Sequence, residues 1–207
     1  MYDRSGARAP ALKGQIRTLA AQEMSLLRDH LERLDATSRH DRFYGFIDEG
    51  FIGRFAAKCA LDGTIVVAYV EDGVVRAAAE LHRPDQAEPL PEIAFSVESP
   101  LRRQGLGSQL FTRLIGKARS LGYDSLRITT GSENQPMRAL ARKFGAHLTF
   151  GRGESSGTID LASQDEPSNV PMAVSVPTPV DVARAMMKFN RAYWKMWFRM
   201  AGLDRAA

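Results

Sequence analysis

Residues 92–121 constrain the fold of this chain more than any other stretch. They read EIAFSVESPLRRQGLGSQLFTRLIGKARSL. Ile93, Phe95 and Val97 alternate with other residues, which is the period of a strand. A basic turn with one proline and two glycines follows, and apolar residues then recur at helical spacing until Gly122 can end the helix. The stretch therefore predicts a strand, a tight turn and a helix that begins inside the turn.

The predicted turn has the features of an anion-binding site. The first amides of a helix lack internal partners and carry the positive end of its dipole, so they bind phosphate well. Gly105 and Gly107 allow the backbone to approach a ligand without a side chain in the way. The predicted phosphate contacts are the N–H groups of Gln104, Gly105, Leu106, Gly107 and Ser108, with the charges of Arg102 and Arg103 at the rim.

Three phosphate-binding patterns can be compared with this turn. A P-loop needs a lysine after its last glycine, and Gly107 is not followed by one. A dinucleotide-binding turn needs a third glycine where the chain has Leu110, and an acid at the end of the next strand, whereas Asp124 precedes that strand. The third pattern, Gln/Arg-x-x-Gly-x-Gly/Ala, fits residues 102–107.

With this pattern between a strand and a helix, the chain resembles the GNAT superfamily of N-acetyltransferases over about residues 13–161. The resemblance implies an α/β (α+β) fold, with a mixed and mostly antiparallel sheet flanked by helices. It also implies acetyl-CoA as co-substrate and no metal. The segment 36–44, ATSRHDRFY, is similar to the Ser-x-x-x-x-Arg-Phe segment in GNAT domains of bacterial protein-lysine acetyltransferases.

The remaining pattern predicts one domain with an appendage. Residues 1–13 are expected to be a flexible N-terminus, 14–161 the GNAT domain, 162–179 a linker rich in Pro and Ser, and 180–203 a basic amphipathic helix. Within the domain we expect a strand at 15–19, a helix at 23–34, a polar loop at 35–42, a helix at 46–59, a hairpin of 64–70 and 74–81 turning at Asp-Gly, a strand at 126–130, a helix capped by Asn134, and a last hairpin of 147–150 and 158–161.

Charge and cysteine content indicate where in the cell the protein acts and which classes of partner it binds. The net charge of +4 belongs to residues 178–207, which hold six Lys or Arg and two Asp or Glu, while the rest of the chain has 22 of each. The main body therefore gives no reason to expect a nucleic-acid surface. Cys59 is alone, and neither a signal peptide nor a membrane-spanning run is evident, so a cytoplasmic location is expected.

The resemblance also assigns roles on the central strand. In the family this strand pairs its backbone with the pantetheine arm, which places the arm on Phe95, Ser96 and Val97. The Val97 N–H would be the oxyanion donor, and Glu92 would be the base that takes the proton of the amine. The alternative for Glu92 is a solvated residue at a strand end.

Four further positions bear on the chemistry. Glu80 could act from the neighbouring strand, whereas Glu98 lies past the central strand, where phosphates would repel it. The tyrosine that many members use as general acid falls at Ala141, so that acid is missing. Asn134 matches a family asparagine near the cofactor, although it can equally be a plain N-cap.

Metal chemistry has little support in the sequence. The histidines have no spacing that suggests a metal site, and each is expected to be a surface or packing residue. Cys59 falls on an apolar helical face and is expected in the core rather than as a nucleophile. The histidines are His30, His40, His82 and His147.

The tail is predicted to be a helix with an apolar and a basic face. Such a helix can pack on its own domain or on a second copy, lie in a membrane surface, or enter a groove of another protein. Two functions from different classes follow. One is acetyl transfer to a primary amine, on a protein lysine or a small molecule. The other is an acyl-CoA-binding sensor or scaffold, catalytically weak, that acts through the tail.

Overall fold

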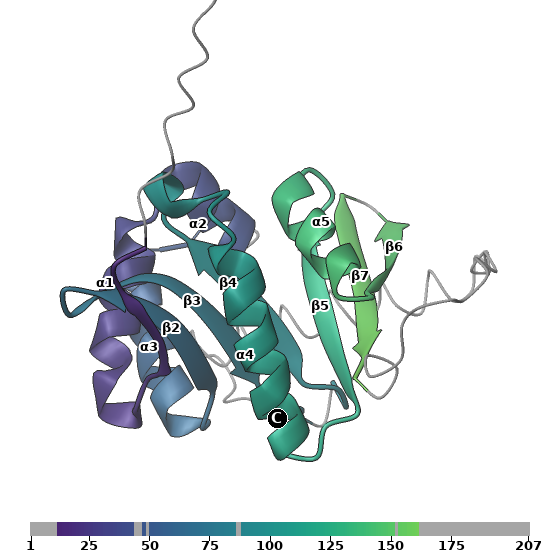
Figure 1. The fold of residues 1–207 in the computed structure, drawn as a ribbon, viewed down its shortest axis with the longest axis horizontal. Coiled ribbons are helices and arrows are strands. Elements are labelled where there is room, and N and C mark those ends of the chain that lie inside the picture. Colours follow the sequence, from purple (N-terminus) through teal and green to yellow (C-terminus); the bar gives the residue numbers. More distant parts are fainter. Residues whose placement is uncertain (1–11, 44–46, 49, 86–87, 152, 162–207) are drawn as a thin grey trace, which may run out of the picture.

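A single seven-stranded sheet forms the centre of the protein (Figure 1). The computed structural model describes residues 12–43, 47–48, 50–85, 88–151 and 153–161. The strand order is β1-β2-β3-β4-β5-β7-β6, and neighbours are antiparallel except for the parallel pair β4 and β5. The strands are β1 Gln15–Thr18, β2 Ile65–Glu71, β3 Val74–His82, β4 Glu92–Val97, β5 Ser125–Gly131, β6 His147–Gly151 and β7 Glu154–Asp160. The predicted mixed, mostly antiparallel sheet is confirmed.

Helices cover both faces of the sheet. One hydrophobic core joins β2 and β3 to α1, α2 and α3, and a second core joins the sheet to α4 and α5. Figure 1 shows α4 crossing in front of the sheet, with α5 beside it over β5. The helices are α1 Met24–Arg33, α2 Ala36–Phe43, α3 Phe51–Leu61, α4 Leu106–Ser120 and α5 Gln135–Lys143, with short 3-10 turns η1 Ala21–Glu23 and η2 Ser99–Leu101. The predicted flanking helices are thus present.

The hairpin of β2 and β3 runs through the middle of the fold. Side chains of a strand alternate between faces, and here both faces are covered, so Val66 packs toward α1 and α3 while Val67 packs toward α4. This explains the unbroken run of apolar and aromatic residues at 65–70 of β2. Asp72 and Gly73 turn the chain with φ of 51° and 76°, as a type I′ turn requires. The Asp-Gly prediction is therefore confirmed.

One expected loop is a helix. We expected residues 35–42 to be polar loop, but α2 occupies 36–43. Asp35 Oδ1 accepts the N–H of Ser38 at 2.8 Å, which satisfies an amide at the start of the helix. Phe43 is buried in the core shared with α1 and α3. The helix is short and almost entirely polar, so its sequence shows no apolar period and its stability depends on tertiary contacts.

The last strand is longer than predicted. We expected a strand at 158–161, whereas β7 begins at Glu154 and pairs with β5 on one side and β6 on the other. Backbone pairing on both edges holds its polar first half in the sheet. The predicted linker 162–179 and helix 180–203 lie outside the described residues. In the part of the chain that the structure describes, no helix is long and apolar enough to cross a bilayer.

Candidate active site

The parallel strands β4 and β5 separate soon after they meet. Only Glu92 and Ile93 of β4 are in register with β5. The N–H of Glu98 donates to Arg76 O in a 3.1 Å bond, and backbone groups alternate in direction along a strand, so the N–H groups of Phe95 and Val97 point toward β5. Beyond Ile93 this edge of β4 has no strand partner among the described residues. The sheet is thus open beside the predicted pantetheine strand.

The helix α4 begins after η2 and the glycine turn that follow β4. Its N-cap is Gly105, which has a φ of 78° and no side chain to satisfy the first amides. Gln109 is the first residue to make a backbone bond back into the turn, 3.2 Å from Gly105 O. No described side chain caps the N–H groups of Leu106, Gly107 and Ser108. These amides can therefore bind an anion.

The two glycines of the turn serve different purposes. A Cβ on Gly105 would meet nothing within 4 Å, so its left-handed φ is the reason for glycine there. A Cβ on Gly107 would lie 3.3 Å from Leu140 Cδ2 of α5. Gly107 therefore allows the first turn of α4 to pack closely against Leu140 of α5. The sequence alone did not indicate this contact.

The cations at the predicted phosphate site differ from those expected: Arg102 is bonded within the protein, and Lys143 is an additional cation. Arg102 Nε donates to Val97 O at 3.1 Å, and its guanidinium also bonds Ser38 Oγ of α2, so it ties the turn to α2. Arg103 is exposed and has a φ of 61°. Lys143 of α5 donates to Ser108 Oγ at 2.9 Å. Lys143 thus adds a cation at the start of α4 that the sequence pattern missed, because it lies 35 residues away.

Two other predicted contacts are occupied within the protein. The Gln104 side chain donates through Nε2 to Pro100 O at 3.0 Å, which leaves its backbone N–H as the group available to a ligand. Asn134 Oδ1 accepts the N–H of Met137 at 3.1 Å, so it caps α5. The capping alternative for Asn134 is therefore present in the structure.

The predicted base, Glu92, lies where β4 and β5 are still paired. Its Oε2 accepts from Arg127 Nη2 at 2.7 Å, and Arg127 also binds Glu88 at 2.7 Å. The Glu92 side chain is 34% exposed. Glu92 is neither buried nor fully solvated, and its other oxygen can face a proton donor.

A second group of polar residues is buried between β4 and α1. His30 is fully buried, and its two ring nitrogens lie 2.9 Å from Ser96 Oγ and 3.3 Å from Glu98 Oε1. Glu98 also accepts from Arg33 at 3.1 Å and from Arg76 at 3.0 Å. Burial alone would raise the pKa of Glu98, but His30 and the two arginines lower it to about 2. Glu98 is thus a fixed carboxylate and not a residue at the phosphate turn.

A comparison with known families decides the assignment. The sequence model of the acetyltransferase (GNAT) family matches residues 26–146, which is more than half of the chain. The chain belongs to the GNAT acetyltransferase family. The match includes β4, the glycine turn and α4, and it supports acetyl-CoA as the co-substrate.

Solved structures with the same fold agree. The GNAT domain of PAT from S. lividans has a TM-score of 0.61 and 18% identity, covering 71% of this chain and 90% of that chain. The yncA protein of Salmonella typhimurium, with its cofactor acetyl-CoA, gives 0.57 and 19%, covering 76% and 99%. PaiA N-acetyltransferase of Thermoplasma acidophilum, in complex with coenzyme A, gives 0.55 and 12%, covering 72% and 99%. At these identities the likeness concerns the fold.

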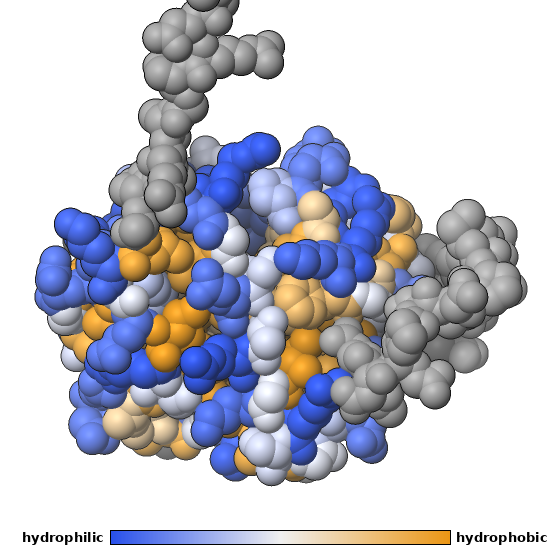
Figure 2. Space-filling view, in the orientation of Figure 1, coloured by the Kyte–Doolittle hydropathy of each residue, from blue (hydrophilic) through white to orange (hydrophobic). Residues whose placement is uncertain are grey.

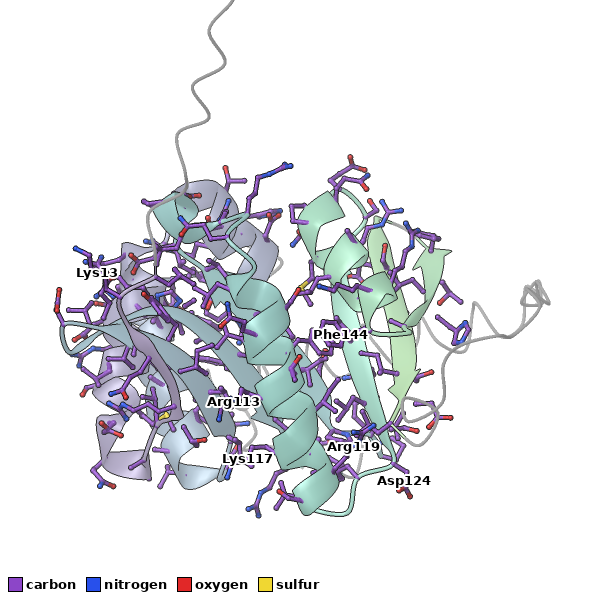
Figure 3. All side chains as sticks on the ribbon, in the orientation of Figure 1. Lys13, Arg113, Lys117, Arg119, Asp124 and Phe144 are labelled. Carbon is purple, nitrogen blue, oxygen red and sulfur yellow. The ribbon has the colours of Figure 1, made fainter. Side chains whose placement is uncertain are left out.

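This GNAT protein has a buried alanine at the position of the missing tyrosine. Ala141 is fully buried. Nearby, Phe144 stacks on Phe111 with ring centres 4.2 Å apart, and Phe111 stacks on Phe95 at 4.8 Å. Figure 3 shows Phe144 between α4 and β5, and Figure 2 shows apolar side chains gathered on this side of α4. Stacked aromatic rings thus fill the space between β4, α4 and the end of α5.

The remaining acidic candidate, Glu80, is held in an ion pair. It is fully buried, and Arg42 of α2 binds it through two nitrogens, at 2.5 and 3.3 Å. His82 Nε2 lies 3.2 Å from the same carboxylate. Burial would raise the pKa of Glu80, but the charge of Arg42 and the hydrogen bond with His82 lower it to about 2. A carboxylate so bound is a poor base for a substrate amine.

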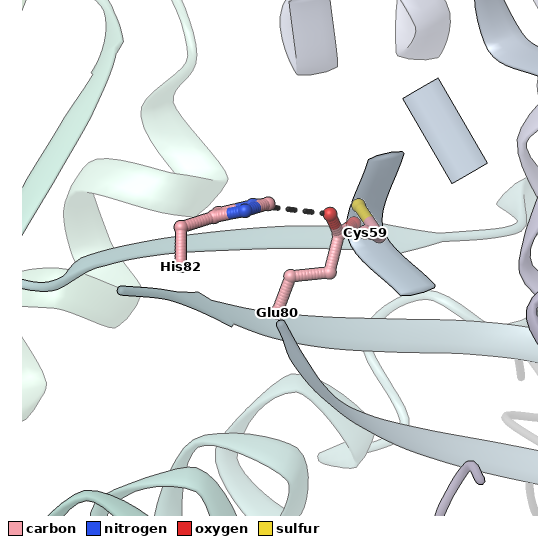
Figure 4. Close-up of side chains that lie close together, drawn as sticks. All are labelled: Cys59, Glu80 and His82. Atoms are coloured by element: carbon pink, nitrogen blue, oxygen red, sulfur yellow. Dashed lines mark ion pairs between the residues drawn. The ribbon is translucent and has the colours of Figure 1, made fainter. Parts of the chain in front are cut away.

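Glu80 also belongs to the group of metal-ligand types found among the described residues. Cys59 Sγ, a Glu80 oxygen and a His82 nitrogen all lie within 4.8 Å of one another (Figure 4). Burial raises the pKa of the Cys59 thiol to about 12, so the thiol keeps its proton. Arg42 already neutralises Glu80. The chemistry of these groups therefore suits a packed polar cluster better than a metal site.

Proposed function

We propose that this protein is an N-acetyltransferase that moves the acetyl group of acetyl-CoA to a primary amine by direct attack. The observation that carries the proposal is the open edge of β4 beside the uncapped start of α4. A CoA thioester carries a diphosphate and an arm with amide groups. The start of α4 is suited to the diphosphate, and the strand edge is suited to the arm.

Phosphate binding rests on the amides of the turn. The donors are those predicted from the sequence, Gln104, Gly105, Leu106, Gly107 and Ser108, with Arg103 and Lys143 supplying charge. Arg102 contributes indirectly, because its bonds to Val97 O and Ser38 fix the turn against β4 and α2. Asn134 contributes by capping α5 beside this site.

The open edge of β4 aligns the thioester. The N–H groups of Phe95 and Val97 point to it, so the Val97 N–H is the proposed donor to the oxyanion of the tetrahedral intermediate. The N–H of Ser96 points toward β3 instead, so of the three predicted residues only Phe95 and Val97 offer a backbone N–H to the arm. Removing one oxyanion donor, an asparagine side chain, lowers kcat by about 10²- to 10³-fold in another acyl-transfer enzyme.

Glu92 is the proposed base for the amine. It lies at the point where β4 leaves β5, and Arg127 holds one of its two oxygens. The ion pair orients the carboxylate and leaves the second oxygen to accept a proton, directly or through a water molecule. Glu92→Gln should then lower kcat and leave acetyl-CoA affinity unchanged.

Calorimetric titration of acetyl-CoA into Gly105→Glu tests the cofactor site. The new carboxylate would lie where the diphosphate binds, so affinity should fall about 100-fold or more, which equals the loss of one or two charge-assisted hydrogen bonds. Gly105→Ala controls for backbone strain at the positive φ. Gly116→Glu controls for added charge, because it places the same side chain in open space on α4. Unchanged affinity in Gly105→Glu would refute the site.

The second candidate is a sensor or scaffold that binds acyl-CoA with weak catalysis. Ala141 favours it, because the usual acid is absent there. Thiol release on panels of amines and lysine peptides separates the two functions. Turnover with any acceptor supports the enzyme, whereas tight acetyl-CoA binding without turnover supports the sensor.

The acceptor and the surroundings of the protein are further proposals. A protein lysine is the favoured acceptor because residues 36–43, which form α2, belong to the segment similar to protein acetyltransferases, and one structural neighbour is the GNAT domain of PAT. We place the protein in the cytoplasm. The predicted helix 180–203 would bring it to a second copy or to a membrane surface. Liposome co-sedimentation of the full chain against a chain ending at Leu161 tests the membrane proposal, which equal pelleting would refute.

A further inference from the structure

A serine, a histidine and a glutamate form a buried chain beside the proposed thioester site. Ser96 Oγ lies 2.9 Å from His30 Nε2, and His30 Nδ1 lies 3.3 Å from Glu98 Oε1. His30 comes from α1, whereas Ser96 and Glu98 come from β4 and the residue that follows it. The sequence separations of 66 and 68 residues hid this arrangement from sequence analysis. None of the steps proposed above uses it.

The charges around His30 determine its proton positions. Glu98 Oε1 faces Nδ1 and also accepts from Arg33, while Oε2 accepts from Arg76, and these bonds keep Glu98 a carboxylate. A carboxylate can only accept, so Nδ1 carries a proton toward Glu98. In the neutral ring Nε2 is then an acceptor, and the Ser96 hydroxyl donates to it. This is the arrangement of a hydroxyl, a base and an orienting acid.

Ser96 belongs to the part of β4 that is no longer in register with β5. Ser96 stands between Phe95 and Val97, whose N–H groups point to the open edge of β4, and it retains 7% exposure while His30 has none. Proton exchange between His30 and a substrate can therefore pass through Ser96. The family tyrosine, which would protonate the thiolate, is replaced by the buried Ala141.

We propose that Ser96, His30 and Glu98 form a proton shuttle that carries the proton of the attacking amine to the departing CoA thiolate. The inference rests on the proposed acetyl transfer. As the C–N bond forms, the ammonium proton passes to Ser96 Oγ while the Ser96 proton passes to His30 Nε2. As the C–S bond breaks, His30 returns its proton through Ser96 to the sulfur. Glu98 stabilises the transient imidazolium, and the protein ends in its starting protonation state.

The roles of Glu92 and the shuttle are distinct. Glu92 deprotonates the ammonium form of the free amine before attack, whereas the shuttle moves the second proton, which the nitrogen must lose after attack. Ser96 is the catalytic residue of the shuttle because it touches the reacting atoms. His30 and Glu98 are positioning residues that act through Ser96.

Steady-state kinetics of Ser96→Ala test the proposal. General acid and base catalysis is worth about 10²- to 10⁴-fold, so we expect kcat to fall about 100-fold while the Kd of acetyl-CoA stays within about twofold. Ser96→Thr keeps the hydroxyl and should restore most of kcat. The matched control is Ser155→Ala, which removes a buried strand serine hydroxyl without a hydrogen-bond partner in the described part of the chain.

The pH dependence separates a shuttle from a structural network. When the shuttle is missing, solvent and buffer bases must take the amine proton, so the deficit of Ser96→Ala and His30→Gln should shrink as pH rises. Loss of structure would instead lower acetyl-CoA affinity and thermal stability together and leave kcat per binding-competent molecule unchanged. Glu98→Gln removes the orienting charge and also the ionic partner of Arg33 and Arg76, so its kcat is measured on folded protein, where it should fall while the Kd of acetyl-CoA is unchanged.

The outcomes are decisive in each case. Wild-type protein that binds acetyl-CoA but never releases thiol would refute the proposed enzyme. Wild-type turnover with a Ser96→Ala kcat within twofold of it would refute the shuttle alone. If Ser96→Ala does not fold, Ser96→Thr and Ser96→Cys are compared, because both keep a proton donor and must both retain turnover with a normal pH profile. Loss of kcat in a folded Ser96→Thr that still binds acetyl-CoA would overturn the proposal.

Discussion

Replacing Arg42 should reverse the sign of the contribution that Glu80 makes to the pH dependence of the free energy of unfolding. In the wild type the folded pKa of Glu80 is about 2 against an ordinary 4.5. A lowered folded pKa contributes stability above pH 4.5 that is lost as pH falls toward 2. A difference of this size corresponds to about 3 kcal/mol, and both side chains are buried enough to avoid strong solvent screening.

In Arg42→Met, Glu80 stays buried with only His82 as a partner. Burial then raises its folded pKa, so the ionised form destabilises the variant at neutral pH and protonation relieves the cost as pH falls. Breaking a buried ion pair by removing one partner costs about 3–5 kcal/mol. We therefore expect a deficit of that size at pH 7 that narrows steadily toward pH 4.

Urea unfolding from pH 4 to pH 8 measures this difference. Arg54→Met is the matched control, because Arg54 pairs with Asp48 at 2.6 Å in an exposed pair. Such pairs contribute within about 1 kcal/mol, so the control should stay near the wild type at every pH. A deficit of Arg42→Met below 1 kcal/mol, or one that does not change with pH, would refute the assigned ion pair.

Three smaller predictions follow from close contacts. Gly14→Ala should lower the free energy of urea unfolding by about 1–3 kcal/mol, since its Cβ would lie 2.3 Å from Val70 O. Gly116→Ala has open space for its Cβ and should stabilise α4 by about 0.5–1 kcal/mol, so equal effects of the two substitutions would contradict the prediction. Lys143→Ala should weaken acetyl-CoA binding several-fold at low salt and less at high salt, and Lys58→Ala should not. Phe144→Ala should lower thermal stability through the lost stack on Phe111, and an unchanged melting temperature would contradict it.

Local patterns predicted the parts of the fold that depend on neighbouring residues. The strand, glycine turn and helix around Gly105 were predicted because backbone geometry there is set by glycine and by apolar period. The Asp72-Gly73 turn was predicted for the same reason. The helix α2 was not predicted, because its polar sequence carries almost no apolar period and it is held by Phe43 and by a cap from Asp35.

The candidate site was predictable only in part. The phosphate-binding turn is contiguous, so its amides could be named from the sequence. The chain from Ser96 through His30 to Glu98 joins residues 66 and 68 positions apart. The pair of Arg42 and Glu80 spans 38 positions. No pattern in a single sequence marks such contacts, because they depend on how α1 and α2 pack on the sheet.

Amide hydrogen exchange along β4, measured with and without acetyl-CoA, tests the central claim most directly. If the thioester arm binds the open edge, the N–H groups of Phe95 and Val97 should become protected on binding, as should those of Leu106, Gly107 and Ser108. The N–H groups of Ala94 and Ser96 already face β3 and should change little. Equal change at all four β4 positions, or no change at Phe95 and Val97, would contradict the account.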